Sequence, residues 1–282
     1  MENKQQHPLV SAIIPTFNRG WILREAIQSV IDQTYQPMEI IVVDDGSTDE
    51  TPSLLHAFGQ QIRVITQENR GVSAARNLGI RASRGELIAL LDSDDLWTPE
   101  KIDRQVAFFN DHPDAMICQT QEIWIRNGKR VNPKNKHKKR GGMIFEPSLE
   151  LCLVSPSAVM MHRTLFDLKG FFDERLPACE DYDLWLRIST THPIHLMDQA
   201  CTIKRGGHDD QLSGHHSLDR YRIAAIEKLL DTDALTPEQR RAAVKVFQEK
   251  TAIYGQGCIK RGKIDLGKHY LAKGKKGYAP GA

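Results

Sequence analysis

The feature that most constrains the fold of this chain is a buried strand that ends abruptly in acidic residues. Residues 87–91 are all apolar, which is typical of a β-strand covered on both faces. Side chains two apart in an extended chain point the same way, so Asp92 and Asp94 share one side just past this strand. Two such carboxylates repel each other unless a cation lies between them, which favours a divalent metal that also binds phosphate. The alternative is an acidic turn that caps a helix beginning near residue 99.

Strands and helices alternate through the first part of the chain. We expect the first strand to end at Pro15, which cannot donate to a sheet ladder, and Ser47 with Glu50 to form a capping box. Such alternation predicts a parallel sheet with right-handed crossovers. Apolar runs predict strands at 9–14, 40–43, 62–65 and 86–91, and helical spacing predicts helices at 22–31, 72–79 and 99–110.

Polar clusters follow three of these predicted strands. Ligands of parallel sheets bind at the carboxyl ends of the strands, so we expect the three clusters to gather at one edge. The clusters are Thr16, Asn18 and Arg19 after the first strand, Asp44 and Asp45 after the second, and Asp92 and Asp94 after the fourth. This convergence favours the metal site over the acidic turn. The glycine patterns of a dinucleotide site and of a P-loop are both missing from the sequence, which argues against those two classes.

The region from about residue 115 to 145 has a different character. Short β-like runs at 115–118 and 123–125 precede a basic stretch, and no acidic residue occurs from 123 through 145. The favoured interpretation is a solvated, mobile hairpin loop; the alternative is an electrostatic contact with anionic lipid headgroups or an acidic acceptor. The basic residues are Lys129, Arg130, Lys134, Lys136, Lys138, Lys139 and Arg140.

A second acidic cluster lies at the start of a predicted helix. Glu180, Asp181 and Asp183 precede or open the helical pattern of residues 184–188. Acidic residues at a helix N-terminus are stabilising by themselves, but three within four positions exceed what capping requires. Further on, His208 lies in a polar, glycine-rich segment; it is either a metal or phosphate ligand or an ordinary surface histidine.

Helical patterns fill the rest of the chain, at 221–230, 237–253 and 258–271, with Gly262 expected to close a hairpin of the last two. We therefore divide the chain into an α/β domain over residues 1–215, a helical extension over 216–272 and a basic, disordered tail over 273–282. The domain has two halves, residues 8–112 and residues 113–215.

Composition excludes several classes of protein. The 282 residues are 40% hydrophobic and carry a net charge of +2, so no charge bias indicates nucleic acid as a partner. No apolar stretch approaches the length of a membrane span, and the polar leader does not match a signal peptide. Five scattered cysteines without a paired spacing indicate reduced thiols in a cytoplasmic protein, and argue against zinc.

Several motifs together resemble family 2 glycosyltransferases, over roughly residues 8–215. No single motif is specific for this family, but the occurrence of all of them in this order is. They are Ser11-Ala-Ile-Ile-Pro-Thr-Phe-Asn-Arg19, Ile41-Val-Val-Asp-Asp-Gly-Ser47, Gly71-Val-Ser-Ala-Ala-Arg-Asn77, Asp92-Ser-Asp94, Glu180-Asp181 and Gly206-Gly-His208.

The resemblance implies an α/β fold of the GT-A type: a Rossmann-like, mixed, mainly parallel sheet flanked by helices, here with a C-terminal helical appendage. It also implies Mn²⁺ or Mg²⁺, a nucleotide-diphospho-sugar donor bound by the nucleotide-binding half (residues 8–112), and a glycan or lipid-linked acceptor bound by the acceptor-binding half (residues 113–215). By the same resemblance, the metal ligands would be Asp94, Asp92 and His208. The donor would be bound by Pro15, Thr16, Phe17, Asn18, Arg19, Asp44, Asp45, Gly71, Arg76, Asp92 and Ser93, with Thr16, Phe17 and Asp45 at the nucleobase and Arg76 facing the diphosphate.

The resulting hypothesis is an inverting glycosyltransferase that uses a UDP-sugar and a carboxylate base. Asp181 matches the base position of the family, while Glu180 and Asp183 compete for that role. The alternatives are a metal-dependent sugar-phosphate nucleotidyltransferase and a non-catalytic module that binds sugar nucleotides or glycans. The basic stretch at 129–140 adds a possible peripheral contact with the inner face of a membrane. The sequence indicates neither the sugar nor the oligomeric state.

Overall fold

The protein is described here by a computed structural model that covers residues 7–208, 218–275 and 278. The first part of the chain runs β1 (Val10–Thr16), α1 (Gly20–Ile31), β2 (Met38–Asp44), α2 (Thr51–His56), η1 (Gly59–Gln61), β3 (Arg63–Thr66), α3 (Val72–Ala82), β4 (Leu87–Leu90), β5 (Leu96–Trp97) and α4 (Lys101–Asp111). The rest runs β6 (Ile117–Arg126), β7 (Lys129–Val131), η2 (Asn135–His137), α5 (Phe145–Glu150), η3 (Pro156–Ala158), β8 (Val159–His162), α6 (Thr164–Lys169), α7 (Glu180–Ser189), β9 (His195–Gly206), α8 (Asp219–Leu230), α9 (Pro237–Lys260) and α10 (Ile264–Lys273).

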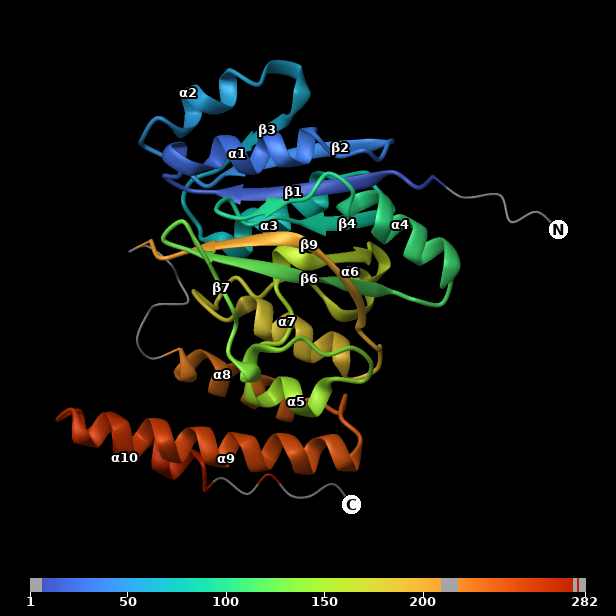
Figure 1. Cartoon of the computed structure of the whole chain (residues 1–282). Helices are drawn as coiled ribbons and strands as arrows, with labels where there is room; N and C mark the ends of the chain where they lie inside the picture. The colour runs from blue at the N-terminus through green and yellow to red at the C-terminus, as the bar shows by residue number, and fades with distance from the viewer. Residues whose placement is uncertain (1–6, 209–217, 276–277, 279–282) are drawn as a thin grey trace.

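One mixed sheet forms the centre of the described chain (Figure 1). Its strand order is β3-β2-β1-β4-β8-β6-β9-β5, and β7 pairs with β6. Strands β3, β2, β1 and β4 are parallel, β8 runs antiparallel to its neighbours β4 and β6, and β9 runs parallel to β6. The predicted α/β fold with a mixed, mainly parallel sheet is thus confirmed.

Helices cover both faces of this sheet because its central strands are apolar on both sides. In β1, Ala12 and Ile14 pack with α1, α2 and α4 on one face, whereas Ile13 packs with α3, α6 and α7 on the other. A third cluster joins α5 and α7 to α8 and α9, so the C-terminal helices lie against the second half of the domain, at the opposite end from α2 and β3 (Figure 1). None of the described helices combines the length and the apolar composition needed to cross a bilayer.

Two local predictions in the first part of the chain are wrong. Strand β1 continues through Pro15 to Thr16, because successive residues of a strand bond to alternate sides and Pro15 faces β4, which has already ended at Leu90. Ser47 does not cap α2: its Oγ accepts a hydrogen bond of 2.8 Å from the backbone N–H of Asn18. A tertiary contact therefore replaces the expected capping box.

The region after α4 is also more ordered than the sequence suggested. The two predicted short runs form one strand, β6, and the basic stretch begins as strand β7. Lys139 is only 8% exposed and pairs with Glu122 at 3.1 Å, so the prediction of a fully solvated loop is wrong at this residue.

The C-terminal helices form the expected hairpin, with Gly262 at a φ of +78° in the turn. Helix α9 is continuous to Lys260, however, where the pattern suggested a break after Ile253. Gly255 lies within α9 and faces Gly267 of α10 so closely that a Cβ on either would meet backbone oxygen within 3.0 Å. Lys273 ends α10 and is not part of the tail; the predicted boundary at 215 and most of the tail lie outside the described residues.

Candidate active site

A cavity of about 750 Å³ opens where the strand ends of β1 and β4 face the start of α7. The β6–β7 hairpin and the end of β9 also line it. Eight of the residues that the resemblance assigned to the donor, the metal or the base line this cavity: Pro15, Arg19, Arg76, Asp92, Ser93, Asp94, Glu180 and Asp181. Seven others lie outside its lining: Thr16, Phe17, Asn18, Asp44, Asp45, Gly71 and His208.

Arg76 joins two halves of the cavity. It lies on α3, whose Gly79 packs so closely on the sheet that a Cβ there would meet the side chain of Ile13 at 2.5 Å. The Arg76 guanidinium donates to Asp92 and to Glu180, each at 2.6 Å, and its side chain is 4% exposed. Burial lowers the pKa of Arg76, but these two carboxylates outweigh burial and raise it above the ordinary value. Only its Nε lacks a hydrogen-bond partner among the described residues.

Of the two carboxylates Asp92 and Asp94, which follow β4, Asp94 has the longer contacts. Its Oδ2 lies 3.5 Å from Arg19 Nη1 and 3.5 Å from His208 Nε2, longer than the contacts of Arg76. Burial and the charge of Asp92 raise the pKa of Asp94, although Arg19 and His208 act in the opposite sense. Trp21, which the sequence did not single out, packs edge-on against the His208 ring at 5.3 Å.

This donor set fits a hard divalent ion that is shared with a ligand. No three acidic, histidine or cysteine side chains converge as a closed metal site within the described chain. Asp92 is engaged by Arg76, which leaves Asp94 and His208 as the adjacent donors. Mg²⁺ and ions like it are commonly held by one or two carboxylates together with substrate phosphates.

Asp45 organises the loop that leads into α3. Its carboxylate accepts hydrogen bonds from the backbone N–H groups of Arg70, at 2.9 Å, and Gly71, at 2.8 Å, and from the side chain of Gln67. The β1–β2 register places Asp44 directly beside Thr16 at the same sheet edge. Thr16, Asp44 and Asp45 therefore lie at the sheet edge but outside the lining of the cavity.

The loop after β1 is fixed by the loop after β2. Asn18, at a φ of +51°, accepts a hydrogen bond from the Thr48 backbone N–H at 2.8 Å, and Asp44 accepts one from Ser47 at 3.0 Å. Phe17 remains 43% exposed beside this joint, and the Thr16 hydroxyl is buried without a hydrogen-bond partner in the described chain.

The three acids at the start of α7 have different surroundings. Glu180 is bound to Arg76, and Asp183 is 1% exposed and paired with Arg187 and Lys228 at 2.8 and 2.5 Å. Asp181 lines the cavity and makes no ion pair within the described residues. The Cys152 thiol contacts its Oδ2 at 3.5 Å, and the Tyr182 backbone N–H donates to its Oδ1.

A buried charge network in the lining of the cavity was missed by sequence reasoning. Burial raises the pKa of Asp95 to about 8, although Lys204 opposes that shift, and Ser157 donates to its carboxylate at 2.6 Å. Lys139 and Lys204 outweigh burial at Glu122 and lower its pKa to about 2. The pattern could have flagged Asp95, which follows the acidic pair directly, but not the pairing of β6 with β9 that brings these groups together.

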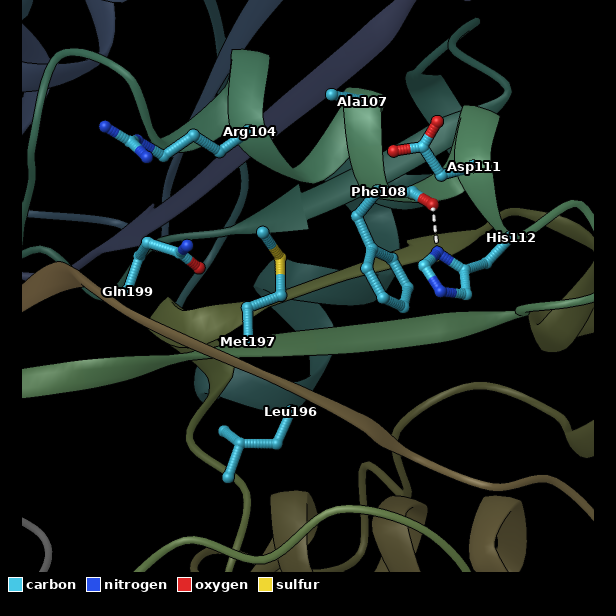
Figure 2. A pocket seen from close by; sticks show the side chains of 8 residues that line it. All are labelled: Arg104, Ala107, Phe108, Asp111, His112, Leu196, Met197 and Gln199. Carbon is cyan, nitrogen blue, oxygen red and sulfur yellow. Dashed lines mark hydrogen bonds between the residues drawn. The ribbon is translucent and has the colours of Figure 1, made fainter.

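A second, smaller hollow of about 340 Å³ lies between α4 and β9 (Figure 2). Figure 2 shows the rings of Phe108 and His112 side by side. His112 Nδ1 lies 2.9 Å from the Phe108 carbonyl oxygen. None of the predicted site residues lines this hollow.

Comparison with known proteins identifies the family. The model of the family described as Glycosyl transferase family 2 matches residues 11–168. The chain belongs to glycosyltransferase family 2. The resemblance noted in the motifs is thereby confirmed.

Curated relatives of this family 2 member include named glycosyltransferases. An uncharacterized glycosyltransferase of Rickettsia felis is 36% identical over 72% of this chain, and the match spans 35% of that protein. The chain thus spans about a third of the length of some of its relatives. The protein named UDP-Glc:alpha-D-GlcNAc-diphosphoundecaprenol beta-1,3-glucosyltransferase WfgD, from Escherichia coli, is 32% identical over 64% of this chain and 69% of its own length.

Solved structures share the fold. TarS 1–349 of S. aureus, in complex with UDP-GlcNAc, matches 94% of this chain and 79% of its own with a TM-score of 0.71 at 19% identity. The mannosyltransferase PcManGT of Pyrobaculum calidifontis, in complex with GDP-Man and Mn²⁺, matches 95% of this chain and 86% of its own with a TM-score of 0.61 at 16% identity.

Proposed function

We propose that this protein is an inverting glycosyltransferase that moves a sugar from a UDP-sugar to an acceptor hydroxyl. Family membership supports transfer of a sugar, and a relative named for UDP-Glc and a similar fold in complex with UDP-GlcNAc support the uridine nucleotide. The observation that carries the proposal is that Asp181, without an ion pair among the described residues, shares one cavity with Asp92 and Asp94. A base and a site for a metal-bound diphosphate are the two parts that such a reaction requires.

The leaving group is a diphosphate whose negative charge grows as the sugar–phosphate bond breaks. Asp94 and His208 would hold Mn²⁺ or Mg²⁺, with Asp92 close by on Arg76. Such an ion, when bound, supplies positive charge where the negative charge develops. Arg19 lines the same wall of the cavity and adds a fixed positive charge there.

The acceptor hydroxyl is a weak nucleophile and must lose its proton as it attacks. We assign this proton to Asp181, because Arg76 holds Glu180 and the pair Arg187 and Lys228 holds Asp183. Attack from the side opposite the leaving diphosphate inverts the anomeric centre. A positioned carboxylate base is commonly worth about 10²–10⁴-fold in rate.

The nucleotide is assigned to the sheet edge beside the cavity. We place the nucleobase near Thr16, Phe17 and Asp45. This assignment is supported by the Thr16 hydroxyl, which lacks a hydrogen-bond partner in the described chain, by the exposed ring of Phe17, and by the loop that Asp45 orders. Pro15, Asn18, Asp44, Gly71 and Ser93 complete this proposed donor site. The five free cysteines support a reducing compartment, such as the cytoplasm, as the place of action.

A donor assay tests the proposed function directly. The protein is incubated with Mn²⁺ and a panel of UDP-, GDP- and dTDP-sugars, and melting temperature and release of the nucleoside diphosphate are measured. We expect a UDP-sugar to raise the melting temperature only with metal and to be hydrolysed slowly without acceptor. Release of pyrophosphate from a nucleoside triphosphate and a sugar phosphate would instead assign a nucleotidyltransferase. Binding with no hydrolysis or transfer would assign a non-catalytic module.

A further inference from the structure

The β6–β7 hairpin presents a cationic and aromatic face to the cavity. Asn127 and Gly128 form its two-residue turn, with φ of +49° and +72°, as a tight type I′ hairpin requires. The register pairs Trp124 with Val131 and Arg126 with Lys129, and paired residues lie on the same side of an antiparallel ladder. Residues two apart share that side as well.

Trp124 is a fixed, half-exposed platform on this face. Its indole N–H donates to Glu122 at 2.9 Å, and Glu122 is held in turn by Lys139 at 3.1 Å. The His137 ring lies 5.6 Å from the Trp124 ring. Because these contacts hold the ring before any ligand arrives, little conformational entropy is lost when the apolar face of a pyranose packs against it.

Cationic side chains without an ion pair in the described chain lie on the same hairpin as the platform. Arg126 and Lys134 line the cavity, are exposed, and make no ion pair within the described residues, and Lys129 lies across from Arg126. The cations deeper in the cavity are already engaged: Arg76 by Asp92 and Glu180, and Lys139 by Glu122. The rim therefore retains positive charge for an anionic ligand.

The platform is connected to the proposed base through β9. Trp124 pairs with Lys204 in the β6–β9 register, and the carboxylates Glu122, Asp95, Asp92 and Asp181 raise the pKa of Lys204 above its ordinary range, despite its burial. Trp124, Lys204 and Asp181 all line one cavity.

We propose that the Trp124 face of this hairpin is the acceptor subsite, and that the acceptor is a glycosyl phosphate: a sugar stacked on Trp124 whose phosphate lies against Arg126 and Lys129. The arginine fork matches phosphate oxygens, and a second cation beside it favours an anion over a neutral glycan. This inference rests on the proposed function, because it assigns the second substrate of the same reaction.

Binding of small acceptor analogues tests the inference without knowledge of the natural acceptor. The probes are propyl glycosides of glucose, galactose and N-acetylglucosamine, and the matching propyl glycosyl phosphates, titrated into the whole protein with UDP and Mn²⁺ present. We expect at least one glycosyl phosphate to bind roughly tenfold or more tightly than its neutral partner. Equal affinities of the two series, or no binding of any phosphate probe by a protein that binds UDP, would overturn the inference.

Variants separate the aromatic from the ionic contribution. Trp124→Ala should weaken both series, with most of the affinity restored in Trp124→Phe, and Arg126→Glu with Lys129→Glu should abolish the preference for phosphate. The charge-matched control is Lys260→Glu with Lys263→Glu, at the exposed turn between α9 and α10, which should change nothing. A phosphate preference that survives reversal of Arg126 and Lys129 would contradict the assignment.

Two further measurements separate this inference from its alternatives. UDP affinity should be unchanged in every hairpin variant; a wild-type protein that does not bind UDP would refute the proposed function itself. Binding to phosphatidylglycerol vesicles tests the alternative that the hairpin contacts a membrane. Vesicle binding that depends on Arg126 and Lys129, without discrimination between the two probe series, would assign the hairpin to a lipid surface and overturn the acceptor subsite.

Discussion

Arg76 Nη1 lies 2.6 Å from Glu180 Oε1, although the two residues are 104 positions apart in the sequence. With Asp92 on its other nitrogen, Arg76 ties the strand end of β4 to the first turn of α7. The contact joins the two halves of the cavity and decides which acid is available at α7. Because Glu180 is engaged and Asp181 is not, the neighbouring carboxylates have separate roles in the proposed reaction.

The first prediction concerns the stability that this contact provides. Arg76→Met should lower the free energy of unfolding by about 3–5 kcal/mol, because it leaves two carboxylates in a buried site without their counter-charge. Urea denaturation measures this loss. Adding Glu180→Gln to the variant should recover part of it, since one of the two stranded charges is then removed. A double variant that is as unstable as the sum of the single ones would refute coupling of the pair.

The second prediction separates the base from donor binding. Asp181→Asn should reduce transfer by about 10²–10⁴-fold while UDP affinity stays within about twofold of wild type, because the amide keeps the shape but cannot accept the proton. Calorimetry measures binding and nucleotide release measures turnover. The matched comparison is Asp183→Asn, which alters a buried ion pair. This variant should lower the free energy of unfolding and change the turnover rate less than Asp181→Asn does. Full activity of Asp181→Asn would show that another group accepts the proton of the acceptor hydroxyl.

The third prediction concerns the metal. Asp94→Ala should abolish the Mn²⁺-dependent part of UDP binding, because it removes the carboxylate closest to His208. Calorimetric titration of UDP with and without Mn²⁺ measures the effect, and Mn²⁺ binding followed by electron paramagnetic resonance provides a readout independent of activity. Asp114→Ala, at an exposed position, is the control. The same metal dependence in the Asp94 variant and in wild type would exclude Asp94 as a ligand.

The parts of the site that the sequence predicted are those encoded locally. Apolar runs such as 87–91 end in acid within a few residues, so the position of Asp92 and Asp94 at a strand end follows from their own neighbours. Adjacent parallel strands then bring Thr16 and Asp44 to the same edge.

The parts that it missed depend on pairings between distant segments. Nothing near Glu122 indicates that β9 will lie beside β6 and bring Lys204 to it, and nothing near Arg76 indicates Glu180. Ser47 satisfied the local rule for a cap, but the Asn18 backbone was the better partner in the folded chain. One local signal was available and unused: Asn127-Gly128 is the typical sequence of the tight hairpin found there.

Lys101 is a buried amine that belongs to no proposed site. It is fully buried beneath the sheet, donates to Gln105 at 2.6 Å, and lies 4.2 Å from the centre of the Trp97 ring. Burial lowers its pKa from 10.5 to about 7. On folding, Lys101 therefore either loses its proton or is buried with its charge. In both cases the free energy of folding becomes less favourable by an amount that depends on pH.

The last prediction is the pH dependence that Lys101 creates. In the unfolded chain Lys101 keeps its proton up to about pH 10.5, whereas in the folded protein it loses it near pH 7, so between these values the unfolded state binds more protons. Stability should therefore rise with pH across this window, and the penalty should be largest and constant below pH 7. Lys101→Met should stabilise the protein by a few kcal/mol at pH 6, and by progressively less toward pH 9. Urea denaturation from pH 6 to 9 measures the difference, with the exposed Lys263→Met as the control; a difference that does not change with pH would show that Lys101 keeps an ordinary pKa in the folded protein.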